Sequence, residues 1–185
     1  MSWLDWVFVA ICVIWISEFF LFPNRQGNGG ETMEKRSFIS IFLALGSTIV
    51  AALLLREFEG DGLFVQAMQG VGIILFALGV FLRFWGIRHL KSQFTRNVTV
   101  QEGDEIVSTG PYRILRHPLY TALLFIGVGM ALYLASVMAA VIGGSLLVWT
   151  LLNRIDYEEQ LLIEKFGPEY EQWMQKRARL FPYLY

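Results

Sequence analysis

Five long apolar runs dominate this chain of 185 residues and limit the folds that it can adopt. Three of them, Trp3–Phe22, Phe38–Leu55 and Leu63–Leu82, contain 20, 18 and 20 residues. An α-helix rises about 1.5 Å per residue and the bilayer core is about 30 Å thick, so each run can cross a membrane. The first run has no basic start and carries Asp5, which argues against a secretory signal. The runs therefore predict a polytopic, all-α membrane protein.

The other two apolar runs, Leu119–Leu134 and Val137–Leu152, contain 16 residues each and are separated only by Ala135 and Ser136. They predict a tight helical hairpin that either just spans the membrane or dips deeply into it. In both cases its two ends emerge on the same face. We therefore expect about five transmembrane helices, the last two forming this hairpin.

Composition excludes several other classes of protein. Hydrophobic residues make up 55% of the chain, charged residues only 17%, and the mean hydropathy is +0.50, whereas a soluble domain carries about a quarter charged residues. The net charge is −1 and no basic stretch is long enough to follow a phosphate backbone, which argues against a nucleic-acid partner. One cysteine, Cys12, and two histidines, His89 and His117, predict neither a disulfide framework nor a metal site.

The basic residues predict the orientation in the membrane. Of the fifteen lysines and arginines, all except Arg56 lie in segments 23–37, 83–118 and 154–185. The positive-inside rule places these segments in the cytoplasm, with the N-terminus outside and the C-terminus inside. We expect residues 1–94 to supply three N-terminal helices, and residues 95–185 to form a core with the hairpin, a C-terminal helix and a pocket at the cytosolic face.

The stretch from Gly110 to Tyr120, GPYRILRHPLY, carries one set of candidate functional residues. Pro118 is suited to the first position of the fourth apolar helix, where its missing N–H is not needed. The positive end of that helix would then face the cytosolic pocket and could attract an anionic group of a ligand, with His117 and Tyr120 beside it. The alternative is a generic juxtamembrane cluster of basic and aromatic residues.

A second stretch begins where the fifth apolar run ends. Arg154 and Glu158 are spaced i, i+4 and share a helix face, and Phe166-Gly167-Pro168 ends that helix. A guanidinium at the lipid boundary is suited to bind a carboxylate or phosphate on a lipophilic molecule. The alternative is an ordinary surface ion pair with a snorkelling arginine.

Two features inside the apolar runs concern packing. Glu18 and Arg83 could pair between helices or lie near the membrane interface, and we favour the interface for Arg83. The pair Gly127 and Gly129 follows no predicted strand, so it indicates close helix packing rather than a dinucleotide-binding loop.

Taken together, GPYRILRHPLY, the apolar hairpin, RIDYEEQLLIEKFGPEYEQW and RLFP resemble the catalytic core of the isoprenylcysteine carboxyl methyltransferase family. These are integral membrane enzymes that use S-adenosylmethionine. The resemblance covers roughly residues 95–185, and the first three spans match only in being hydrophobic.

The resemblance implies roles for individual residues. Arg154 and Glu158 would form the catalytic, substrate-binding end, in which Arg154 holds one carboxylate oxygen of a lipophilic acceptor while the other attacks the methyl group. If the acceptor were a phenol, enol or amine, Glu158 could take up its proton. The acidic run 104–107 departs from the family pattern and implies cofactor contacts through its backbone, and Tyr157 stands where relatives often have a carboxylate. The implied cofactor contacts are Gln101, Asp104, Glu105, Ile106, Val107, Tyr112, His117, Pro118, Leu119 and Tyr120.

Other functions stay open at this point. One alternative is N-methylation of a phospholipid or aminolipid, and another is a sterol-reductase-like enzyme that uses NADPH, although the chain lacks the extra spans expected of a reductase. A third is a non-catalytic membrane protein that keeps the pocket for binding. The hydrophobic substrate would enter sideways from the bilayer through a gap between helices.

Overall fold

The computed structural model describes residues 2–22, 32–55, 62–96 and 103–182, and most of these are helical. Two short 3₁₀ helices, η2 (Lys91–Gln93) and η3 (Gly110–Arg113), follow α3 and precede α4. The α-helices of the described residues are α1 (Trp3–Leu21), α2 (Thr32–Leu55), α3 (Leu63–Leu90), α4 (Pro118–Tyr133), α5 (Val137–Phe166) and α6 (Pro168–Met174).

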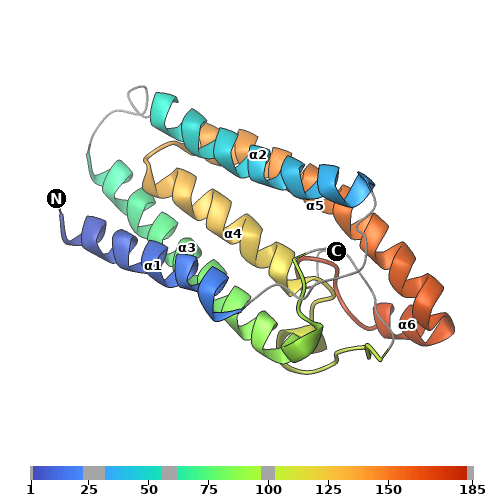
Figure 1. The fold of residues 1–185 in the computed structure, drawn as a ribbon. Coiled ribbons are helices and arrows are strands. Elements are labelled where there is room, and N and C mark those ends of the chain that lie inside the picture. Colours follow the sequence, from blue (N-terminus) through green and yellow to red (C-terminus); the bar gives the residue numbers. More distant parts are fainter. Residues whose placement is uncertain (1, 23–31, 56–61, 97–102, 183–185) are drawn as a thin grey trace.

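Helix α4 lies at the centre of the bundle. It packs against α3, α5 and α2, while α1 packs on α3 and α2 on α5. Figure 1 shows that η2, η3, α6 and the C-terminal end of α5 gather at one end of the bundle, opposite the turn between α4 and α5. The two polar segments of the sequence therefore meet at one end of the molecule, as predicted.

The helices have the length and composition of membrane spans. Helices α1, α3 and α5 are long and apolar enough to cross a bilayer, and Ile39–Leu55 and α4 are shorter apolar helices. Large apolar side chains cover their outer faces: Trp6 is 64% exposed, Phe81 63% and Trp149 64%. Side chains of this kind are stable at a surface that contacts lipid. The chain is an integral membrane protein, as its apolar runs predict.

The hairpin forms as predicted. Helix α4 ends at Tyr133, and Ala135 turns the chain with a φ of 61°. Ser136 then caps α5, because its hydroxyl accepts a hydrogen bond of 3.2 Å from the backbone N–H of Ala139. Helix α5 continues to Phe166 and stops at Gly167, whose φ is 57°, so the end inferred from Phe166-Gly167-Pro168 is also correct.

The glycine pair in α4 serves helix packing, as predicted. A Cβ added at Gly129 would lie 2.6 Å from the backbone N of Phe76 and 2.7 Å from the carbonyl O of Gly72, both on α3. A Cβ added at Gly127 would lie 3.0 Å from Leu45 of α2. The backbones of α3 and α4 approach too closely at Gly129 for any side chain to fit between them.

The sequence favours a position near the membrane interface for Arg83, and this prediction is wrong. Arg83 donates from Nε and from Nη2 to the two carboxylate oxygens of Glu18, each over 2.5 Å, and the pair joins α3 to α1. Glu18 is fully buried and Arg83 is 8% exposed. A buried carboxylate is stable only with a partner, so packing of α1 on α3 requires this pairing. Helix α3 continues past Arg83 to Leu90, beyond the end of its apolar run at Leu82.

Candidate functional site

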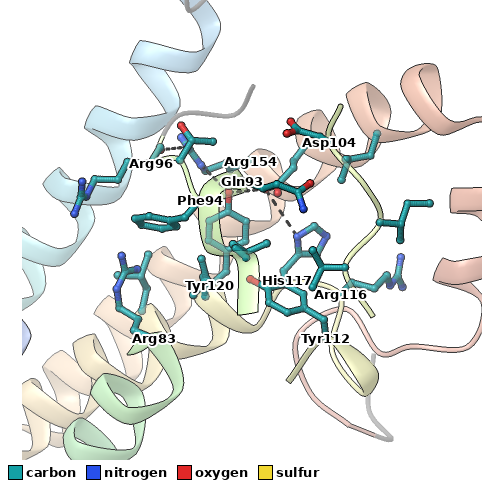
Figure 2. Close-up of a pocket in the computed structure, with 18 of the residues that line it drawn as sticks. Arg83, Gln93, Phe94, Arg96, Asp104, Tyr112, Arg116, His117, Tyr120 and Arg154 are labelled. Carbon is teal, nitrogen blue, oxygen red and sulfur yellow. Dashed lines mark hydrogen bonds and ion pairs between the residues drawn. The ribbon is translucent and has the colours of Figure 1, made fainter. Parts of the chain in front are cut away.

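A cavity of about 230 Å³ lies at the end of the bundle where the polar segments meet. Every α-helix contributes to its wall, and it lies between the two candidate motifs (Figure 2). Tyr112, His117 and Arg154, which come from the two motifs, all line this cavity. The implied site residues that line it are Asp104, Glu105, Ile106, Val107, Tyr112, His117, Leu119, Tyr120, Arg154 and Glu158.

Of the implied cofactor residues that the structure describes, Pro118 does not line the cavity. Pro118 is buried at the first position of α4, where it starts the helix as predicted. Gln101 lies outside the described residues. Their roles toward a cofactor, like those of the lining residues, stay predictions.

The segment before α4 turns at Gly110 and brings Tyr112 to the cavity. Gly110 has a φ of 57°, and a Cβ there would lie 2.6 Å from the ring of His89, so only glycine fits. Tyr112 follows in η3 and is 7% exposed. Burial, with Glu158 and Tyr120 nearby, raises the pKa of the Tyr112 phenol well above its usual value. Tyr112 therefore offers a neutral hydroxyl to the cavity.

His117 is the residue immediately before α4 and is only 5% exposed. Its imidazole stacks on Tyr120 with the ring centroids 5.7 Å apart. Its Nε2 lies 3.0 Å from Oε1 of Glu159, and its Nδ1 lies 3.8 Å from Oε2 of Glu158. The ring therefore stands between two carboxylates of α5.

Tyr120 connects the two residues predicted to form the substrate end. Its hydroxyl donates to Oε2 of Glu158 over 2.6 Å and accepts from Nε of Arg154 over 2.9 Å. Nη2 of Arg154 donates to the carbonyl O of Arg96 over 2.8 Å. Arg154 is 3% exposed, so its charge is held inside the wall of the cavity rather than snorkelling to the surface.

Glu159 is a site residue that the sequence does not single out. Its Oε1 accepts from Nη1 of Arg116 over 2.8 Å, and its Oε2 accepts from Nη2 of Arg179 over 2.6 Å. Although burial opposes it, the contacts with Glu159 and Asp156 raise the pKa of Arg179 above its usual value. The only sequence signal is the doubled glutamate, which does not say which carboxylate faces the cavity.

The C-terminal segment is part of the site because it lies beside the entry to α4. Leu115 and Ala178 form a parallel bridge, with Arg116 N–H donating to the Ala178 carbonyl over 2.8 Å. The hydroxyl of Thr121 donates to the Leu180 carbonyl over 2.7 Å. The RLFP motif, which begins at Arg179, thus packs against the RHP motif.

Helix α6 closes the side of the cavity away from the apolar helices. Trp173 donates from Nε1 to the hydroxyl of Ser108 over 2.7 Å and stacks on Tyr170 with centroids 5.3 Å apart. Within the acidic run, the N–H of Glu105 donates to Oε1 of Gln93 over 2.7 Å. This wall therefore combines aromatic rings, carboxylates and an ordered backbone.

The opposite side of the cavity is apolar and reaches the outer surface of the bundle. Phe19 of α1 and Phe42 of α2 both line the cavity and are also 44% and 50% exposed. Arg96 stands at this junction, where its guanidinium lies 4.8 Å from the Phe19 ring and donates to the Phe22 carbonyl over 2.9 Å. The apolar residues Trp15, Ile41, Leu45 and Leu123 of α1, α2 and α4 also line the cavity.

The chemistry of the wall does not suggest a metal centre. Among the described residues, no group of three or more histidine, cysteine, aspartate or glutamate side chains is placed to hold a metal ion.

Comparisons with known proteins identify the family. The model of the isoprenylcysteine carboxyl methyltransferase (ICMT) family matches residues 72–164. Protein-S-isoprenylcysteine O-methyltransferase A of Arabidopsis thaliana is 30% identical over 190 residues, covering 98% of this chain and 93% of the relative. A probable protein-S-isoprenylcysteine O-methyltransferase of Oryza sativa subsp. indica is 28% identical over 188 residues, covering 97% and 96%.

The fold agrees with a solved structure, that of the eukaryotic intramembrane Ras methyltransferase ICMT. The TM-score is 0.70 at 18% sequence identity, covering 95% of this chain, and this chain spans 63% of the solved one. The similarity reaches beyond residues 95–185, where the motifs lie, because the family model already matches in α3 and the relatives align over nearly the whole chain. The chain belongs to the isoprenylcysteine carboxyl methyltransferase family.

Proposed function

We propose that this protein is an S-adenosylmethionine-dependent methyltransferase that methylates the carboxylate of a prenylated cysteine or a closely similar lipophilic acid. Its family and the printed names of its relatives support this activity. The observation that carries the proposal is that Tyr112 and His117 line the same cavity as Arg154, with Glu158 between them. The reaction needs such a cavity, because donor and acceptor must meet away from water.

The polar side of the cavity fits the proposed cofactor. S-adenosylmethionine would supply a methyl group already activated by a sulfonium centre. The carboxylates of Asp104 and Glu158 suit its positive charges, and the rings of Tyr170 and Trp173 suit both its cationic centre and its adenine. The neutral hydroxyl of Tyr112 adds a hydrogen-bonding group. These residues, with His117, would hold the cofactor.

The protein's own part in the reaction is to bind and align the acceptor. A carboxylate is ionised at neutral pH and needs no general base. Arg154, fixed by Tyr120 and by the Arg96 carbonyl, would hold one carboxylate oxygen and leave the other to attack. The surrounding apolar side chains exclude water, which strengthens this charge pairing.

Charge favours an anionic acceptor over an amine. The guanidinium groups of Arg154 and Arg96 both line the cavity where its apolar side meets its polar side. Two positive charges at this depth would repel an ammonium headgroup and attract a carboxylate.

The acceptor would enter from the bilayer between α1 and α2. Phe19 and Phe42 line the cavity and are exposed on the outer face, so a prenyl chain could pass between them without crossing water. The basic segments at this end of the bundle support a cytoplasmic position for the polar mouth, with the N-terminus outside. A reporter fused to the C-terminus should therefore score as cytoplasmic.

Methyl transfer with an isotopically labelled donor tests the proposal. The purified protein in detergent is offered an N-acetylated, S-prenylated cysteine, the same molecule with its carboxyl converted to a carboxamide, and an aminolipid. Label should enter the first as a base-labile ester and should not enter the carboxamide. Labelling of the aminolipid alone would indicate an N-methyltransferase, and binding of NADPH but not of S-adenosylmethionine would indicate a reductase.

A further inference from the structure

Glu159 does not line the cavity. It is buried, with 6% of its surface exposed, and lies at the centre of a charge cluster directly behind His117. We propose that Glu159 is a positioning residue for His117: it holds the imidazole in the tautomer that carries its proton on Nε2, so that the Nδ1 lone pair faces the cavity. The inference rests on the proposed function in one respect, which is that the cavity binds S-adenosylmethionine.

The tautomer follows from the chemistry of the contact. Nε2 of His117 lies 3.0 Å from Oε1 of Glu159, which is hydrogen-bonding distance. An ionised carboxylate has no hydrogen to donate, so the imidazole must donate from Nε2. In the neutral ring Nδ1 is then the acceptor. It lies on the side of the second carboxylate, 3.8 Å from Oε2 of Glu158, which belongs to the cavity wall.

Glu159 cannot easily turn away from this contact. Its Oε1 also accepts from Nη1 of Arg116 over 2.8 Å, and its Oε2 accepts from Arg179 at Nη2 over 2.6 Å and at Nε over 3.2 Å. The bridge between Leu115 and Ala178 holds the backbones beside these two arginines together. Both carboxylate oxygens are therefore held by cations from two different segments, and these cations keep the Glu159 carboxyl group ionised.

The consequence is a directed acceptor at the cavity. The stack of His117 on Tyr120 keeps the ring plane in place, and Glu158 beside Nδ1 is a second acceptor. Two neighbouring acceptors are suited to a donor that carries several hydrogens, such as an ammonium group or a pair of hydroxyls. S-adenosylmethionine has both kinds of donor. With the proton on Nδ1 instead, His117 would compete for Glu158 and offer the ligand no lone pair.

Nitrogen NMR of the histidine side chains tests the tautomer without measuring activity. The chain has only two histidines, so a ¹⁵N-histidine-labelled sample of the full protein in detergent gives two imidazole spin systems, which the variant His89→Gln assigns. His89 is an internal reference, because its Nδ1 lies 2.8 Å from the Trp85 carbonyl and must carry the proton. At mildly alkaline pH the two rings should show opposite tautomers. A proton on Nδ1 of His117, with or without one on Nε2, would overturn the proposal.

The variant Glu159→Gln then tests what holds the tautomer. A glutamine can offer His117 either its oxygen or its amide N–H, so we expect a mixture of tautomers and about ten-fold weaker S-adenosylmethionine binding by calorimetry. Glu164→Gln, an exposed glutamate on the same helix, should change neither. An unchanged single tautomer in Glu159→Gln would contradict the proposal. If that variant does not fold, the wild-type spectrum alone still decides.

The two proposals fail in different ways. The predicted tautomer in a protein that shows no heat with S-adenosylmethionine would leave the role of Glu159 standing and remove the proposed cofactor. Normal cofactor binding with the proton on Nδ1 of His117 would leave the proposed cofactor standing and remove the role of Glu159.

Discussion

Glu18 of α1 and Arg83 of α3 meet through two hydrogen bonds of 2.5 Å, with Glu18 fully buried in the bundle. Few of the α1 side chains are buried, so this ion pair is a specific attachment of α1 to the rest of the protein. Arg83 also lines the cavity, as do Trp15 and Phe19 of α1. The pair therefore positions one wall of the acceptor side.

Removing one partner should destabilise the protein strongly. Glu18→Gln leaves the Arg83 guanidinium buried without its counter-ion, and the free energy of unfolding in detergent should fall by about 3 kcal/mol. Thermal unfolding followed by tryptophan fluorescence measures this. The double variant Glu18→Gln/Arg83→Met, in which no charge stays buried, should recover most of the loss. If Glu18→Gln melts like the exposed control Glu164→Gln, the pair does not contribute to stability.

The fold was largely predictable because its main determinant is local. Runs of apolar residues specify where helices form, and the single pair Ala135 and Ser136 specifies the hairpin. The end of α3 was not predictable in this way. Arg83 interrupts the apolar run in the sequence, but its charge is neutralised by Glu18, which is 65 positions away. Only the three-dimensional structure shows that Arg83 is buried and paired, and that α3 continues past it to Leu90.

The site was predictable at its centre but not in its support. Arg154 and His117 were found because they belong to motifs with a recognisable order. The roles of Glu159, Arg116 and Arg179 depend on contacts between α5, the entry to α4 and the C-terminal segment. These three residues lie in the same motifs, but the motifs do not show that their side chains contact one another behind His117.

The contact between α3 and α4 should not tolerate a side chain at Gly129. A methyl group there would meet the backbone of Phe76 and Gly72 at 2.6 and 2.7 Å, and backbone atoms cannot move aside as a flexible side chain can. Gly129→Ala should therefore lower the free energy of unfolding by about 2 kcal/mol. Gly70→Ala on α3 is the matched control, because nothing lies within 4 Å of the added atom. It should be neutral or slightly stabilising, and equal melting of the two variants would refute this packing.

Arg154 should be needed for turnover rather than for cofactor binding. Arg154→Ala removes the guanidinium that we expect to hold the acceptor carboxylate, so methyl transfer should fall by about 100-fold or more. Arg154→Lys keeps the charge but loses the two-pronged donor that contacts Tyr120 and Arg96, and should recover only part of the rate. Calorimetry should show nearly unchanged S-adenosylmethionine affinity in both. Normal methylation by Arg154→Ala would invalidate the assignment of the acceptor end.

His117, unlike Arg154, should be needed for binding of the cofactor. Its ring lines the cavity and stacks on Tyr120, on the side assigned to the cofactor. His117→Ala should therefore weaken S-adenosylmethionine binding by about ten-fold, which corresponds to one charge-assisted hydrogen bond. The control is His89→Gln, which changes the other histidine, a residue outside the cavity wall. An affinity equal in both variants would remove His117 from the cofactor site.

Tyr112 should make folding stability fall at alkaline pH. Burial raises the pKa of its phenol well above the usual value of about 10, so above that pH the unfolded chain loses this proton while the folded protein keeps it. Proton release then favours the unfolded state, and the stability contributed by Tyr112 is complete below pH 10 and declines as the pH rises further. Tyr112→Phe removes this one contribution. The wild type should therefore lose more stability than the variant between about pH 9 and pH 11, as measured by thermal unfolding at each pH. Between pH 7 and pH 9 both proteins should respond alike, which serves as the internal control; parallel curves up to pH 11 would show that the phenol is not buried as the structure describes.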